Sequence, residues 1–91
     1  AYGVEITGTV IETSSEVVEY TDENGNPQRI AFYEVLADIA GTYVRFSTTD
    51  DYLAQLPQAG DSVTITGYVD ESAEFAGNAD FTGFILSLKI N

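Results

Sequence analysis

The side chains of this chain that could do chemistry are almost all carboxylates. Its 91 residues include 15 Asp and Glu, only three Lys and Arg, and no His or Cys. The commonest general base, the commonest zinc ligand and every thiol nucleophile are therefore missing. Carboxylate catalysis needs two acids facing each other across a cleft, and the spacing places no second acid opposite Glu34. We predict that the protein is not an enzyme and carries no cofactor.

One acidic segment, Asp22–Pro27, alternates Asp and Asn like the first ligands of a calcium-binding loop. Pro27 stands where an EF-hand loop needs Gly, and Tyr33 stands where that loop needs its bidentate Glu. The Asn-Gly pair inside the segment instead favours the positive φ angles of a hairpin turn. We therefore predict a turn and no metal site. The alternative left open is a weak calcium site formed by the later acids Asp70, Glu71 and Glu74.

The elements that position these side chains are predicted mostly from apolar and polar residues that alternate with period two. The first strand covers residues 4–10 and resumes over 16–21, with a kink at residues 13–15. It is either one long bent strand or two strands. The remaining strands are predicted at residues 29–38, 42–48, 63–69 and 84–90.

The register of the second and third strands follows from charge. Turning Glu34 inward would bury an unpaired carboxylate, which is costly, so we place it outside. The core then receives Tyr33, Val35, Ala37, Val44 and Phe46, together with Phe84 from the last strand. The outer face receives Phe32, Glu34, Leu36, Asp38, Tyr43, Arg45 and Ser47. Glu34 and Arg45 then share a face on which a cross-strand ion pair is expected.

One segment is predicted to be helical. Hydroxyl and carboxylate side chains at residues 48–51 precede Tyr52–Leu56 and can cap a short helix. Leu53 and Leu56 lie three residues apart, where they would cover one end of the core. Pro57 ends the helix.

The predicted order, in one domain over residues 1–91, is three strands, a short helix and two strands. A Gly interrupts the strand in VEITGTV (residues 4–10) and again in GDSVTITGYV (residues 60–69). This layout resembles the OB-fold, in which such glycines are common in strands one and four and permit sharp coiling. The resemblance covers nearly the whole chain. It implies an all-β, five-stranded Greek-key β-barrel with one short helix between strands 3 and 4; another small barrel or a sandwich is the alternative.

The OB-fold resemblance implies a binding face on strands two and three, framed by the first and fourth interstrand loops. In similar single-stranded DNA-binding proteins, aromatic rings stack on bases and cations contact phosphate. The implied nucleic-acid-binding residues are Phe32, Tyr43 and Arg45 on the face, Arg29 and Tyr20 on the first hairpin, and Tyr68 at the border. The implied partner is single-stranded DNA or RNA. Separately, no apolar run approaches the length of a membrane span, so we take a cytoplasmic location as the default expectation.

The formal charge of −12 argues against this partner, because phosphate binding ordinarily uses several cations. One alternative is an acidic protein-interaction domain that imitates DNA and engages a basic protein. Another is an accessory domain of a larger assembly, with an apolar contact patch formed by Phe32, Leu36 and Tyr43. Two copies of the chain could also form a homodimer through this patch. The acidity also fits adaptation to concentrated salt, where screening weakens self-repulsion. The aromatic residues, finally, would be explained by β-propensity and core filling alone.

Overall fold

The computed structural model describes residues 2–72 and 74–91 and consists of strands and turns, with no helix in those residues. The five strands are β1 (Tyr2–Thr21), β2 (Pro27–Ile39), β3 (Thr42–Thr49), β4 (Ser62–Asp70) and β5 (Phe81–Ile90). The all-β prediction with five strands is confirmed. Among the described residues, no helix is long and apolar enough to cross a membrane.

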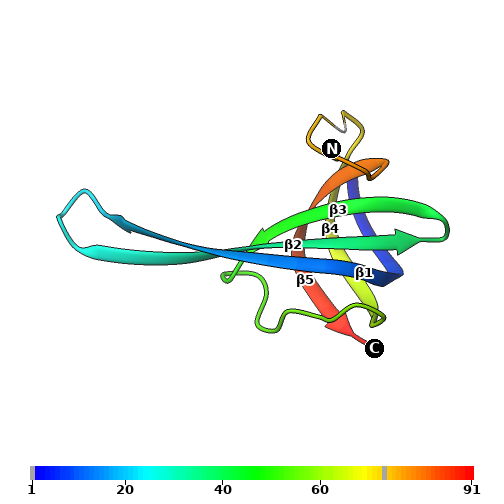
Figure 1. Cartoon of the computed structure of the whole chain (residues 1–91), viewed down its shortest axis with the longest axis horizontal. Helices are drawn as coiled ribbons and strands as arrows, with labels where there is room; N and C mark the ends of the chain where they lie inside the picture. The colour runs from blue at the N-terminus through cyan, green and yellow to red at the C-terminus, as the bar shows by residue number, and fades with distance from the viewer. Residues whose placement is uncertain (1, 73) are drawn as a thin grey trace.

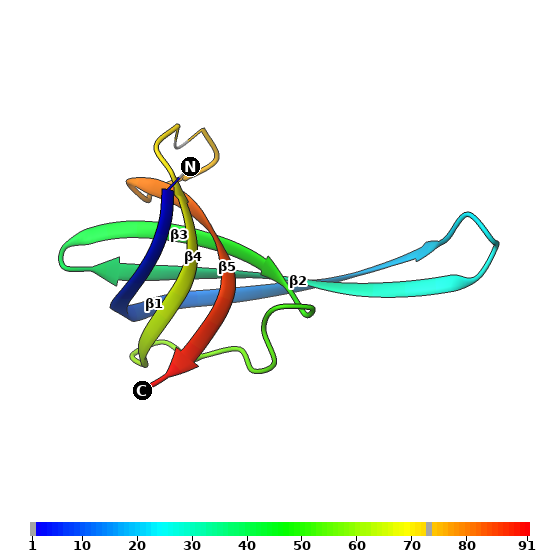
Figure 2. The ribbon, with the colours of Figure 1, turned by 180° about the vertical axis from the view of Figure 1, so that it is seen from behind.

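The strands join into one closed sheet in the order β1-β2-β3-β5-β4. β1 closes the sheet because its first half pairs with β4 and its second half pairs with β2. The β3–β5 pair is parallel and the other pairs are antiparallel. The ends of β1 and β2 extend past the rest of the sheet as a two-stranded ribbon (Figures 1 and 2). We call residues 17–31 the arm, since Phe32 is the first residue of β2 that pairs with β3.

β1 is a single strand, and it bends at a different position from the kink that the sequence pattern predicted. The register with β2 shifts between Val10 and Glu12, which leaves Ile11 as the extra residue of a β-bulge. The serines at residues 14 and 15 pair regularly with β2. The predicted kink at residues 13–15 is therefore wrong, and a bulge two residues earlier bends the strand instead.

The core lies inside the closed sheet and is formed by Val10, Val35, Ala37, Val44, Phe46, Val63, Ile65 and Ile85. The predicted facing of β3, with Val44 and Phe46 inside, is confirmed. Val35 and Ala37 of β2 are also inside, as predicted, and Tyr33 is half-buried. Leu36 was expected to be exposed on the outer face but is only 7% exposed. In the ladder it lies between Glu12 on β1 and Arg45 on β3, whose longer side chains flank it.

Two glycines allow strands to approach where a side chain would not fit. A Cβ at Gly8 would lie 2.6 Å from the Asp38 carbonyl oxygen, and a Cβ at Gly67 would collide with the Phe84 carbonyl oxygen. Both positions lie within the strands in which the sequence pattern singled out a Gly. The glycines thus permit close backbone approach at two points of a small closed sheet.

The prediction that Phe84 belongs to the core is wrong. The β4–β5 register shifts at Thr66/Gly67 because Leu86 is an extra residue, a β-bulge on β5. The alternation of β5 therefore changes side at Leu86: Ile85 is fully buried, whereas Phe84 is only half-buried. Phe84 instead contacts the ring of Tyr52 edge-on, with ring centroids 5.4 Å apart.

The predicted short helix at residues 52–56 is absent, and this segment forms turns and irregular chain. The N–H groups of Tyr52 and Leu53 both bond the Thr49 carbonyl, which makes a single turn, and Pro57 limits any continuation to the three residues that follow Leu53. One turn is too short to offset the cost of helix nucleation. Leu53 is nevertheless buried and Leu56 packs against the core, so these residues do cover its end as predicted.

The turn at the tip of the arm is the predicted hairpin turn. Asp22 Oδ1 accepts hydrogen bonds from the N–H groups of Asn24 and Asn26, both at 2.9 Å, and Gly25 has a φ of 80°. The carboxylate of Asp22 therefore closes the loop as an Asx-turn does, together with backbone hydrogen bonds from Asp22 N–H to the Asn26 carbonyl and from Gly25 N–H to the Asp22 carbonyl.

Candidate nucleic-acid interface

Phe32 and Tyr43 lie on the outer face of β2 and β3 but at opposite ends of it. Phe32 pairs with Thr49, whereas Tyr43 pairs with Asp38, six residues further along β2. At about 3.3 Å per residue the two aromatic residues are roughly 20 Å apart along the strands. They do not form one stacking pair; they border a stretch of outer face between them. That stretch can hold several nucleotides, but not one base between two rings.

Arg45 lies between these rings, and its guanidinium is held by the protein. Its Nε donates a 3.0 Å hydrogen bond to the Ala76 carbonyl, and its Nη1 is 3.8 Å from a carboxylate oxygen of both Glu12 and Glu34. The predicted ion pair with Glu34 is thus confirmed, and Glu12 is a second partner. Only 22% of the Arg45 side chain is exposed. The charge available there to a phosphate is therefore reduced.

The contact of Arg45 with Ala76 also fixes the acidic loop between β4 and β5 against β3. Ala76 is buried, although the residues around it in the loop are exposed. Beside Arg45 a hollow of about 160 Å³ opens between β1, β2 and β3, lined by Glu12, Thr13, Ser14, Glu34, Leu36 and Arg45. Its rim is acidic.

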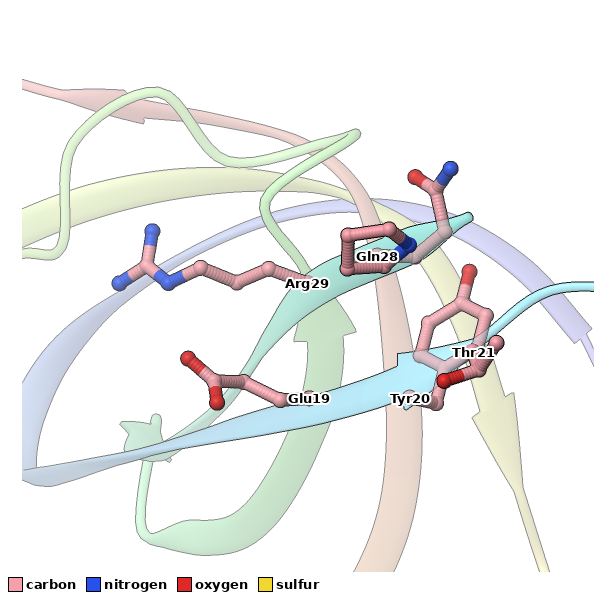
Figure 3. Close-up of a pocket in the computed structure, with 6 residues that line it drawn as sticks. Glu19, Tyr20, Thr21, Gln28 and Arg29 are labelled. Carbon is pink, nitrogen blue, oxygen red and sulfur yellow. The ribbon is translucent and has the colours of Figure 1, made fainter. Parts of the chain in front are cut away.

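Arg29 and Tyr20 lie on the arm, outside the β2–β3 face that carries Phe32, Tyr43 and Arg45. They line an open hollow of about 640 Å³ together with Glu19, Thr21, Pro27 and Gln28 (Figure 3). Arg29 pairs directly with Glu19, and the two side chains extend to the same side. Tyr20 pairs with Gln28 on the other face of the ribbon. Within residues 2–72 and 74–91, Arg29 makes no ion pair, so it is the more available of the two arginines.

Tyr68 does not border the face of β2 and β3. It lies on β4, which β5 separates from β3 in the closed sheet. It pairs with Gly3 and Phe84 and lines a different hollow, of about 220 Å³, with Asp70, Thr82, Gly83 and Phe84. The structure therefore spreads the six predicted residues over three surfaces: the β2–β3 face, the arm and β4.

Core filling does not account for most of the aromatic residues. Seven of the eleven Tyr and Phe residues are exposed, and only Phe46 is fully buried. Phe32, Tyr43, Tyr20 and Tyr68 are each between 40% and 50% exposed. Sequence reasoning also missed Phe75, which is 81% exposed in the loop between β4 and β5. A lone Phe among small and acidic residues, outside any predicted strand, was the available signal.

Two loop carboxylates are stabilised in their ionised form by local hydrogen bonds. The Asn26 N–H, followed by Gln28 and the Asn24 N–H, lowers the pKa of Asp22 below its ordinary value. The Ser72 N–H, with its hydroxyl, lowers the pKa of Asp70 in the same way. Both groups therefore remain negative in the two loops that flank the sheet. No three acidic side chains gather closely enough to hold a metal ion in the part of the chain that the structure describes.

No protein-family model, curated protein or solved structure matches this chain.

Proposed function

We propose that this protein is a non-catalytic binding module of the OB-fold type that binds single-stranded nucleic acid by stacking bases on exposed aromatic rings. The strand order, with β1 shared between β2 and β4 and with β3 parallel to β5, supports the Greek-key assignment. The binding surface comprises the outer face of β2 and β3 and continues onto the arm. Phe32, Tyr43 and Tyr20 provide the rings.

The observation that carries this proposal is the exposure of Phe32 and Tyr43 on the two ends of one face. Burying an aromatic side chain stabilises a fold by about 1.5–3 kcal/mol, and the sheet does not gain this full contribution from either ring. A stacked base covers such a ring and contributes about 1–3 kcal/mol. Because every base has a π-face, this binding tolerates any sequence.

Charge determines how this binding responds to salt. Arg45 is engaged by Glu12 and Glu34, and Arg29 lies on the opposite face of the arm from Tyr20, so at most one cation reaches a strand bound on the proposed surface. On single strands, log affinity falls by about 0.7 per tenfold rise in salt for each phosphate neutralised. We therefore expect a slope no steeper than about −0.7, well below that of proteins that bind through many phosphates. Raising the salt would also screen the repulsion between the strand and the acidic loops.

The test is a titration with a dT oligomer of about 12 nucleotides, within the site size of one OB-fold, followed by tyrosine fluorescence over a salt series. Phe32→Ala and Tyr43→Ala should each weaken binding by about 1–3 kcal/mol, roughly 5- to 150-fold. Tyr2→Ala is the matched control, because Tyr2 is exposed but pairs with β4, away from this face. The proposal fails if the wild-type protein does not bind the oligomer at low or high salt, or if all three variants bind alike.

A second candidate function is an acidic protein-interaction module that engages a basic protein. The observation that favours it is the position of Glu12 and Glu34 on either side of Arg45, which makes the middle of the outer face acidic. A basic partner would compete with nucleic acid for that face, and its binding would weaken steeply with salt. The shallow slope expected for stacking separates the two candidates.

A further inference from the structure

The two long edges of the arm differ in their freedom to accept another strand. On the β2 edge, Pro27 has no N–H to donate. At the other end of that edge, the Asp50 N–H donates to the Ala31 carbonyl at 3.1 Å, and Asp50 Oδ2 accepts from the Ala31 N–H at 3.4 Å. Natural sheets commonly protect edges with proline and with capping side chains. The β2 edge is protected at both ends.

The β1 edge is open over the same stretch. Ala31 directs its backbone groups to Asp50, away from β1, so its partner Val17 must direct its own N–H and C=O to the outer edge of β1. Along an antiparallel pair of strands, every second residue directs its backbone groups to the same edge. The N–H and C=O groups of Thr13, Ser15, Glu19 and Thr21 therefore also point to the outer edge of β1.

No other segment among the described residues covers these groups. β4 pairs with β1 only as far as Thr9, and the chain at Gly60 and Asp61 bonds β1 at Val10. Beyond that point, in the described ranges 2–72 and 74–91, β1 has no backbone partner except β2. The open edge of β1 is thus a run of unpaired donors and acceptors on an exposed ribbon, a template for strand addition.

The charges around this edge select the occupant. Glu12 and Glu16 lie on one face of β1 within the open stretch, and Glu19 lies on the other face, directly opposite Arg29 of β2. A second copy of the chain would bring its own acids to the same place and add another −12. An extended segment with alternating Lys or Arg would instead complement the acids, while exposed Val17 and Val18 provide apolar contact.

We propose that the open edge of β1 binds an extended basic segment of a partner protein as an additional antiparallel or parallel strand. This site is distinct from the aromatic face that carries the nucleic-acid proposal. It is also distinct from the acidic middle of that face, on which the second candidate function rests. Main-chain hydrogen bonds provide the affinity, and Glu12 and Glu16, which lie on the same face of β1, provide the preference for a basic strand.

The test uses a labelled synthetic peptide in which Lys alternates with Val and Thr, titrated with the full chain by fluorescence anisotropy. A control peptide of the same charge has two adjacent central amides N-methylated, which blocks hydrogen bonding from both of its edges. On the protein, Val17→Pro removes an edge N–H without removing a β1–β2 hydrogen bond. Val17→Thr is its matched control, because it keeps the N–H and the shape of the side chain.

We expect the N-methylated peptide and Val17→Pro each to weaken binding by about tenfold, as the loss of one or two backbone hydrogen bonds does, and Val17→Thr to bind normally. Equal binding of the two peptides would mean charge attraction alone and would overturn the proposal, whether or not Val17→Pro folds. Dimerisation of the free chain that Val17→Pro abolishes would assign the edge to a second copy and overturn the basic partner. Binding of the dT oligomer should be unchanged in Val17→Pro, so this proposal and the nucleic-acid proposal fail separately.

Discussion

Gly67→Ala tests whether the close approach of β4 to β5 is required by the fold. A Cβ at this position would collide with the Phe84 carbonyl oxygen and would lie 3.0 Å from its carbonyl carbon and 3.2 Å from the Ile85 Cα. All three are backbone atoms, so no side-chain rotation relieves the contact. The strands must separate at the β-bulge, where Gly67 pairs with the fully buried Ile85.

The expected cost follows from three contributions. Overpacking of a tight site costs about 1–3 kcal/mol, and weakening one hydrogen bond of the ladder costs about 1 kcal/mol. Replacing Gly by Ala restricts the unfolded chain, which offsets about 0.4–1 kcal/mol. Gly67→Ala should therefore lower the free energy of unfolding by about 1–3.5 kcal/mol, a large share of the roughly 5–15 kcal/mol typical of a domain.

The assay is urea unfolding followed by circular dichroism, with Gly3→Ala as the matched control. Gly3 is likewise a strand glycine, in β1 where it pairs with β4. The nearest atom to a Cβ added at Gly3 is 3.9 Å away, which is an ordinary contact. Its free energy of unfolding should stay the same or rise by up to about 1 kcal/mol. If the two variants unfold within about 0.5 kcal/mol of each other, the close approach at Gly67 does not constrain the fold and the reasoning is refuted.

Two further predictions concern charge. The Asn26 N–H is the largest cause of the lowered pKa of Asp22. A carboxyl whose pKa is lower in the folded state stabilises the fold at pH values above its unfolded-state pKa. This stabilisation is lost as the pH falls through the folded-state pKa. Asp22→Ala should therefore lower the melting temperature at neutral pH and reduce its further fall on acidification below about pH 4; an unchanged acid profile would contradict this. Glu12→Gln combined with Glu34→Gln should free Arg45, strengthen binding of the dT oligomer, and steepen the salt slope from about −0.7 to about −1.4, as a second neutralised phosphate does. A slope that stays the same in the salt series would show that Arg45 does not reach the phosphates.

Part of the fold could be predicted because the deciding interactions are local or depend on burial alone. The facing of β3 and of Val35 and Ala37 followed from the cost of burying Glu34. The turn at residues 22–27 followed from the run of turn-forming residues and its Asn-Gly pair. These predictions need no knowledge of which strand lies beside which.

The candidate site could be predicted less well, because its geometry depends on distant segments. The sequence identified Phe32 and Tyr43 as exposed rings, and both are exposed. It did not show that they stand at opposite ends of the face, nor that Tyr68 lies on a different surface. Strand pairing decides these positions.

By itself, the sequence determined the absence of His and Cys chemistry, the all-β class, the number of strands and the outward placement of Glu34. Only the tertiary structure decided the irregular features. One extra residue at Leu86 reversed the facing of Phe84, and a single turn replaced the helix before Pro57. The Ala76 carbonyl, 31 residues from Arg45 along the chain, accepts a hydrogen bond from a guanidinium for which the sequence predicted only Glu34 as a partner. Alternation and propensity act over a few residues, whereas bulges, loop contacts and ion pairs across strands are set when the sheet closes.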